Sequence, residues 1–390
     1  MRPYLLCLLL LHGTWLPSAL GQRVYAPHSK LASGTWYKLG VTQPGVYKIT
    51  VAQLNTIGIN TQSLPSANIR IAGKSGAMLP ENNSGIYKDD LPETALMVAD
   101  GGDGLLNGND YVLFYAPGPH AWEYQTASHT FTHRYNLYSD TAWYFLSVDQ
   151  PGQRLPPDTP AATPGVTVTA FDHIAFYEKD SINLVSSGKQ WWGPVFSNSP
   201  GGTLSRNYTF TLPAPPSGPV QLKARVAARS TGSRFNITVN QQTAGSLNLS
   251  PVSGNIFEAF ATVANGTFTA TVNSPQLEVG AQYNGNNSDQ GWLDYLELQA
   301  RCSLTMPAQA ALLFRDAASV APGATALFIL NNTGSDTRVW DVTNAWKPVQ
   351  VNVQRNGSQL QFARDVSTLR EYVAFNPDQL PQPLFAGTVP

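Results

Sequence analysis

The chain has 390 residues, more than one compact domain usually holds, so two or three domains are expected. Charged residues make up only 13% of it and the formal net charge is −1, which excludes the concentrated basic face that binds nucleic acid. The 32 Gly and 29 Pro residues are typical of many strands joined by tight turns and argue against long surface helices.

Residues 1–21 are predicted to be a secretory signal peptide. Arg2 gives a positive start, residues 5–11 are an apolar run interrupted only by Cys7, and small residues at 19–21 suit cleavage. The apolar run is too short to span a bilayer, and no later stretch is long and apolar enough for a membrane helix. The mature protein is therefore expected to begin near Gln22 and to be exported.

Residues 22–155 are predicted to form an N-terminal β-rich domain. The segment "TWYKLGVTQPGVYKIT" predicts two short strands around a Gln43-Pro44-Gly45 turn. The next segment, "TVAQLNTIGIN", predicts one short helix that Thr50 can cap and that Gly58 can end in the left-handed conformation. The stretches that follow, up to "AWYFLSV", are strand-like and are separated by Gly, Pro or Asn.

The segment "DGGDGLLNGND" within this domain allows two interpretations. Asn-Gly and Asp-Gly pairs favour a turn in front of the strand that follows. The segment does not match an EF-hand loop. Counted from Asp100, Gly102 stands at the third position, where the loop needs an oxygen ligand, and Leu105 at the sixth, where it needs glycine. Five side chains could still bind calcium in another geometry, and calcium is the only cofactor that the sequence suggests: Asp100, Asp103, Asn107, Asn109 and Asp110.

The rest of the chain is also predicted to be β-structure, which makes the fold class all-β with a minor helix. A Pro-rich connector, "RLPPDTPAATPG", precedes a jelly-roll-like β-sandwich expected over residues 165–305. Within it, the alternation of apolar and polar residues at 220–229 indicates a sheet with one face toward solvent. A smaller C-terminal β domain is expected over 306–380. Residues 381–390, "PQPLFAGTVP", are expected to be a linker toward a missing domain, with no closing strand.

Three tryptophans are the best candidates for a ligand or interface surface. Trp191 and Trp192 are adjacent, and Trp292 opens the strand "WLDYLEL". Neighbouring residues on a strand face opposite ways, so at most one of the first two belongs to the core. The other could contact a sugar or another domain.

No catalytic residues are predicted. Cys302 ends an alternating apolar stretch and has no His or acidic partner nearby in sequence, so it is interpreted as a strand residue rather than a nucleophile. His129 and His133 lie on a strand-like segment, which would separate them by roughly 13 Å, too far to share one ion.

An ordered set of segments resembles a known family. The segments are "GTWYKLGVTQPGVYKIT", "GDGLLNGNDYVLFYAPGP", "NLYSDTAWYFLSV", "FYEKDSINLVSSGKQWWG", "GWLDYLELQA" and "TRVWDVTN…LREYVAF". Together they look like the long β-rich region that precedes the peptidase domain in PorU-type sortases of the type IX secretion system, within the gingipain family of cysteine peptidases. The resemblance covers roughly residues 23–390.

The resemblance implies a Bacteroidetes-type protein at the outer-membrane surface or in the periplasm. Members of the family cleave the C-terminal sorting signals of secreted cargo and join the cargo to an anionic lipopolysaccharide, beside an outer-membrane β-barrel partner. Their catalytic His and Cys lie in the gingipain-like domain, and no position of this chain matches either residue. The implied role is therefore a non-catalytic N-terminal scaffold, inactive alone, with a peptidase domain in cis if the chain is a fragment.

Two other functions remain open. A stand-alone secreted carbohydrate-binding or adhesive module would use the sandwich and the three tryptophans, and a structural surface protein would have no peptidase partner.

Overall fold

The computed structural model describes residues 25–74, 76–82, 85, 87–159, 161–186, 188–308 and 311–389. The expected signal peptide at 1–21 lies outside these residues. The described part of the chain is almost entirely β-structure with a single α-helix, which confirms the predicted fold class. Within the same part, no helix has the length and apolar character needed to span a membrane.

The helix, α1 (Val51–Thr56), begins and ends as its sequence predicts. The backbone N–H of Gln53 donates to the Thr50 hydroxyl, and the Gln53 side chain accepts from the Thr50 N–H at 2.8 Å, forming a capping box. Gly58 follows the helix with a positive φ of 88°. Four short 3-10 helices complete the helical content of the described residues: η1 (Lys30–Ala32), η2 (Ser66–Asn68), η3 (Ala317–Ser319) and η4 (Pro377–Gln379).

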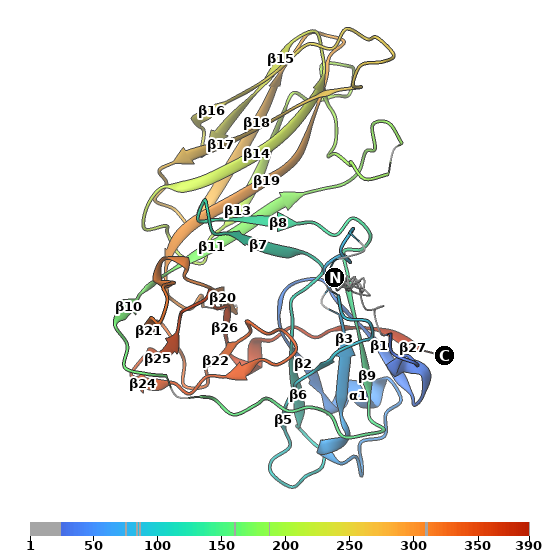
Figure 1. Ribbon diagram of the computed structural model, residues 1–390, viewed down its shortest axis with the longest axis vertical. Coiled ribbons are helices and arrows are strands. Elements are labelled where there is room, and N and C mark those ends of the chain that lie inside the picture. Colours follow the sequence, from blue (N-terminus) through green and yellow to red (C-terminus); the bar gives the residue numbers. More distant parts are fainter. Residues whose placement is uncertain are drawn as a thin grey trace, which may run out of the picture.

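The N-terminal domain packs two antiparallel sheets and α1 around one hydrophobic core (Figure 1). The first sheet has the order β27 (Leu384–Val389), β1 (Trp36–Val41), β9 (Ala142–Ser147), β3 (Arg70–Gly73), β4 (Glu93–Thr94). The second has the order β2 (Gly45–Thr50), β6 (Tyr111–Ala116), β5 (Met97–Ala99).

Strand β27 corrects the expectation for residues 381–390. The segment was expected to be a linker, but Leu384–Val389 pairs antiparallel with β1, with Gly40 opposite Leu384. The prolines at 381 and 383 precede the strand and remove no ladder hydrogen bond from it. The other side of β1 pairs with β9, so β27 covers backbone groups of β1 that would otherwise form a sheet edge.

The middle of the chain is a jelly roll, as predicted. Two four-stranded sheets in the order typical of a jelly roll enclose a shared core. One sheet has the order β11 (Ala170–Glu178), β19 (Gln290–Ser303), β14 (Val220–Arg229), β17 (Thr262–Ala270), with β12 (Phe196–Ser197) beside one end of β19. The other has the order β13 (Ser205–Thr211), β18 (Gln276–Asn284), β15 (Ser233–Val239), β16 (Gln242–Leu249).

The C-terminal β unit also consists of two four-stranded sheets. One has the order β10 (Val166–Val168), β21 (Thr325–Leu330), β25 (Gln359–Asp365), β24 (Gln354–Asn356), and the other β20 (Leu312–Phe314), β26 (Tyr372–Phe375), β22 (Arg338–Asp341), β23 (Val349–Gln350). Its core continues into the jelly roll, because the ring of Phe314 lies 6.4 Å from that of Phe171. The two units are therefore joined by packing as well as by the chain.

A two-stranded hairpin, β7 (Ala121–Gln125) and β8 (Thr130–Arg134), leaves the N-terminal domain and lies across the jelly roll (Figure 1). The side-chain amide of Gln299 on β19 binds the edge of β8 twice: its oxygen accepts from the Phe131 N–H at 3.0 Å, and its nitrogen donates to the Phe131 carbonyl at 2.7 Å. One amide thus serves the backbone as a neighbouring strand would. The predicted wet face of this sheet is partly covered by the hairpin.

Candidate functional site

The acidic loop at residues 100–110 is built as a turn. Asp100, Asp103 and Asp110 each accept a backbone N–H from within the loop, at 3.1, 2.9 and 2.8 Å. The Asn107 amide donates to the second oxygen of Asp103, and Asn109 is exposed. Among the described residues, no three acidic, His or Cys side chains of this loop come within reach of one ion. Calcium binding at this loop stays a prediction.

The three tryptophans lie in two different environments. Trp192 and Trp292 are only 2% and 3% exposed and share a small buried cluster with Ala227. Their indole rings are therefore not available as a surface platform in this structure. Trp191 is 37% exposed, and its indole N–H donates to the Gly188 carbonyl at 2.8 Å. One of the adjacent pair is core and the other is not, although neither lies in a strand and Trp192 makes only an isolated bridge to Ile182.

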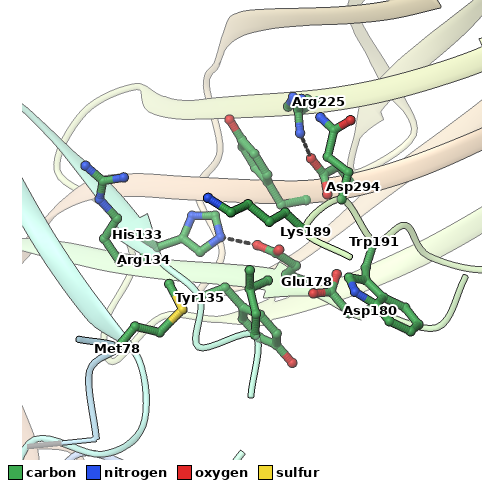
Figure 2. A pocket seen from close by; sticks show the side chains of 13 residues that line it. Met78, His133, Arg134, Tyr135, Glu178, Asp180, Lys189, Trp191, Arg225 and Asp294 are labelled. Atoms are coloured by element: carbon green, nitrogen blue, oxygen red, sulfur yellow. Dashed lines mark hydrogen bonds and ion pairs between the residues drawn. The ribbon is translucent and has the colours of Figure 1, made fainter. Parts of the chain in front are cut away.

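Trp191 borders a pocket of about 220 Å³ between the β7–β8 hairpin and the jelly roll (Figure 2). Three carboxylates line the pocket: Glu178 at the end of β11, Asp180 just after it, and Asp294 on β19. One oxygen from each lies within 4.8 Å of the others. Residues far apart in sequence thus form a single acidic group.

A β-bulge directs Asp294 into the pocket. The pairing of β14 with β19 passes from Tyr295 to Leu293 without a partner for Asp294. Leu293 and Leu296 both belong to the core, so the extra residue allows Asp294 and Tyr295 to face the pocket together. Regular alternation would have sent one of these two side chains to the other face of the sheet.

His133 from the hairpin joins the carboxylates of the jelly roll. Its Nε2 bonds Glu178 and its Nδ1 lies 2.6 Å from Glu297, whose same oxygen also accepts the His133 backbone N–H at 2.9 Å. Burial lowers the pKa of His133, but the hydrogen bonds and charges of the two carboxylates outweigh burial and leave that pKa raised. The imidazole therefore joins the hairpin to Glu178 of β11, a bond that Figure 2 shows, and to Glu297 of β19.

Two further cations neutralise the jelly-roll carboxylates. Arg225 on β14 forms an ion pair with Asp294, and the Lys223 ammonium lies 3.1 Å from Glu297. Burial nevertheless raises the pKa of Asp294 to about 6. The alternation at 220–229 predicts a solvated face for these basic side chains, but the hairpin partly buries that face.

Asp180 has no such partner. Each of its carboxylate oxygens exposes less than 1 Å² and has no hydrogen-bond partner among the described residues. Burial, followed by the charges of Glu178 and Asp294, raises the pKa of Asp180 to about 7. An ionised, buried carboxylate without a donor is unfavourable, so the site favours a proton or a cation here.

The Asp180→Asn variant is expected to show, in calcium-free buffer, that the ionised Asp180 carboxylate destabilises the fold. Because the folded pKa of Asp180 is raised from 3.8 to about 7, its contribution to stability is fully present below the unfolded value and is lost as pH rises through 7. The amide of Asn does not ionise, so the variant does not lose this stability as pH rises. The melting temperature of the variant should therefore exceed that of the unmodified protein at pH 8 but not at pH 4. Equal differences at both pH values would contradict the assignment.

Cys302 lies inside the jelly-roll core. Its side chain is fully buried, its thiol contacts the Ala214 carbonyl at 3.6 Å, and burial raises its pKa to about 11. A thiol in this state is not a nucleophile. The structural environment thus agrees with its interpretation as a strand residue.

Comparisons with known proteins identify the fold. No protein-family model matches the chain, and no curated protein sequence matches it significantly. A crystal structure of dimeric latent PorU from Porphyromonas gingivalis is 24% identical and superposes with a TM-score of 0.78 over 93% of this chain and 34% of that chain. A cycloisomaltooligosaccharide glucanotransferase from Paenibacillus has 10% identity and a TM-score of only 0.20, over 53% of this chain and 44% of that one. The delta-endotoxin Cry8Ea1 from Bacillus thuringiensis has 13% identity and a TM-score of only 0.22, over 62% of this chain and 43% of that one. The chain therefore has a PorU-like β-rich fold and spans about a third of the length of that PorU chain.

Proposed function

We propose that this chain is the non-catalytic scaffold of a type IX secretion sortase-like protein. In this role it positions a gingipain-like peptidase domain and contacts secreted cargo or an outer-membrane β-barrel partner. Its place of action would be the outer-membrane surface or the periplasm.

The observation that carries the proposal is the fold likeness over nearly the whole chain. The PorU superposition covers 93% of the chain, so it includes the N-terminal domain, the jelly roll and the C-terminal unit rather than one common sandwich. A shared order of three units is more specific than a shared jelly roll, which supports many unrelated functions.

The state of Cys302 supports the non-catalytic part of the proposal. The thiol is buried in an apolar core and its pKa is raised, whereas a peptidase nucleophile needs an accessible thiolate beside a base. The geometry of Cys302 therefore gives no support for a cysteine-peptidase nucleophile at this position.

Deletion of the encoding gene in its native host tests the proposal. Cargo proteins should then accumulate with their C-terminal sorting signals uncleaved, and complementation with the Cys302→Ala variant should restore cleavage. The purified chain should show no thiol-dependent peptidase activity. Normal cargo processing after deletion, or peptidase activity of the purified chain that Cys302→Ala abolishes, would overturn the proposal.

Carbohydrate binding is the second candidate, and Trp191 is the observation that favours it. The exposed indole borders a pocket with acidic hydrogen-bond acceptors, an arrangement that suits stacking on a sugar ring. Glycan-array binding that Trp191→Ala abolishes, together with normal cargo processing in the deletion strain, would favour this function over the scaffold.

A further inference from the structure

We propose that Glu178, Asp180 and Asp294 bind a hard divalent cation, with calcium as the preferred ion, between the jelly roll and the β7–β8 hairpin. The site is separate from the loop at 100–110 that sequence analysis singled out. It also does not depend on the proposed scaffold function.

The geometry of the donors is the first argument. The carboxylates of Glu178 at the end of β11, Asp180 just after it and Asp294 on β19 bring one oxygen each to within 4.8 Å of the others, close enough to contact one ion. Glu178 and Asp180 are two residues apart where β11 ends, and the bulge in β19 adds Asp294 from the neighbouring strand. The adjoining pocket of about 220 Å³ has room for water ligands.

The second argument is independent of the clustering. Both oxygens of the Asp180 carboxylate are shielded from solvent, each exposing less than 1 Å², and neither accepts a hydrogen bond from the described residues. A carboxylate can accept about four hydrogen bonds and is rarely left with none when buried. A bound cation would supply the missing contact.

Charge balance gives a third argument. The charged groups around the pocket comprise four carboxylates and three cations: Glu178, Asp180, Asp294 and Glu297, with His133, Lys223 and Arg225. Even with the imidazole protonated, one negative charge remains. The two other basic side chains at the rim have exposed partners of their own: Lys189 pairs with Glu81 at 2.7 Å and Arg134 with Glu123 at 2.8 Å.

The donor set favours a hard ion. All three ligands are carboxylates, which suit calcium or magnesium, whereas zinc prefers imidazole and thiolate ligands. Both ring nitrogens of the nearby His133 are already bonded to carboxylates. Calcium is preferred over magnesium because it accepts several carboxylates in irregular geometry, while magnesium keeps most of its water ligands.

The full chain, freed of metal with EDTA, provides the test at pH 8. Millimolar calcium should raise the melting temperature by about 5 °C, because a ligand that binds only the folded state stabilises it. The Asp180→Asn variant should lose this rise. It should still fold, because the Asp180 carboxylate makes no hydrogen bond that the amide would break.

Asp103→Asn is the matched control, since it makes the same isosteric change in the acidic loop and should keep the full calcium response. Terbium offers a second readout: its luminescence, sensitised by Trp191 and by Tyr135 and Tyr295 in the same pocket, should weaken in Trp191→Phe and disappear in Asp180→Asn. No calcium response in the unmodified protein would overturn the proposal. A response lost in Asp103→Asn but kept in Asp180→Asn would also overturn it and assign calcium to the loop.

Discussion

Replacing Phe314 with Ala is expected to destabilise the protein by about 3–5 kcal/mol, the usual cost of emptying a buried aromatic site. The Phe314 ring is fully buried in β20 and stacks on Tyr372 with the ring centroids 5.1 Å apart. It also contacts Phe171 of the jelly roll, so the cavity would open at the junction of two units. Urea denaturation followed by tryptophan fluorescence should show the lower midpoint.

Phe257→Ala is the matched control for this variant. It removes the same atoms from a side chain that is 91% exposed in the loop after β16, so its effect should stay within about 0.5 kcal/mol. Similar losses in the two variants would mean that the junction of the jelly roll with the C-terminal unit contributes little. A loss confined to Phe314→Ala would show that burial of this ring, between Tyr372 and Phe171, stabilises the protein.

The jelly roll and the helix could be predicted because their signals are local. Alternation at 220–229 follows directly from one buried face, and the Thr50 cap depends on neighbours three residues away. The pairing of β27 with β1 could not be predicted, because it depends on a free sheet edge more than 300 residues earlier in the chain. A short Pro-flanked segment carries no signal of such an edge.

The candidate site, too, depends on contacts between distant segments that local sequence does not show. The loop at 100–110 is dense in Asp and Asn, but its carboxylates accept hydrogen bonds from backbone N–H groups of the same loop. The group formed by Glu178, Asp180 and Asp294 is spread over more than 100 residues and depends on a bulge that leaves no sequence motif. The Asn-Gly and Asp-Gly pairs predicted a turn at 100–110, whereas the cluster of Glu178, Asp180 and Asp294 arises from tertiary pairing.

The Glu297→Ala variant is expected to release the β7–β8 hairpin from the jelly roll. Glu297 is 0% exposed on its side chain and holds two partners, the His133 imidazole at 2.6 Å and the Lys223 ammonium at 3.1 Å. Removing one member of a buried ion pair costs about 3–5 kcal/mol, because the remaining charges lose their compensation. Hydrogen exchange followed by mass spectrometry should show faster exchange over residues 121–134.

Glu123→Ala is the control within the same hairpin. It removes the exposed ion pair with Arg134, which contributes at most about 1 kcal/mol, and hydrogen exchange over 121–134 should remain as in the unmodified protein. Unchanged exchange in Glu297→Ala would mean that the Gln299 amide, the His133–Glu178 pair and the stacking of His133 on Phe176, 4.5 Å between ring centroids, hold the hairpin without Glu297.

The loss of stability in Glu297→Ala should also depend on pH, because both His133 and Glu297 titrate. The raised pKa of His133 gives stabilisation that is fully present below 6.5 and is lost as pH rises through the folded value. Burial acts to raise the pKa of Glu297, but the bonds from His133 leave it lowered, so its stabilisation is fully present above 4.5 and is lost as pH falls. The difference in melting temperature between the unmodified protein and the variant should therefore be largest between pH 4.5 and 6.5. A difference that stays at its maximum above pH 6.5 would show that Lys223, rather than the imidazolium, is the partner that holds Glu297 in place.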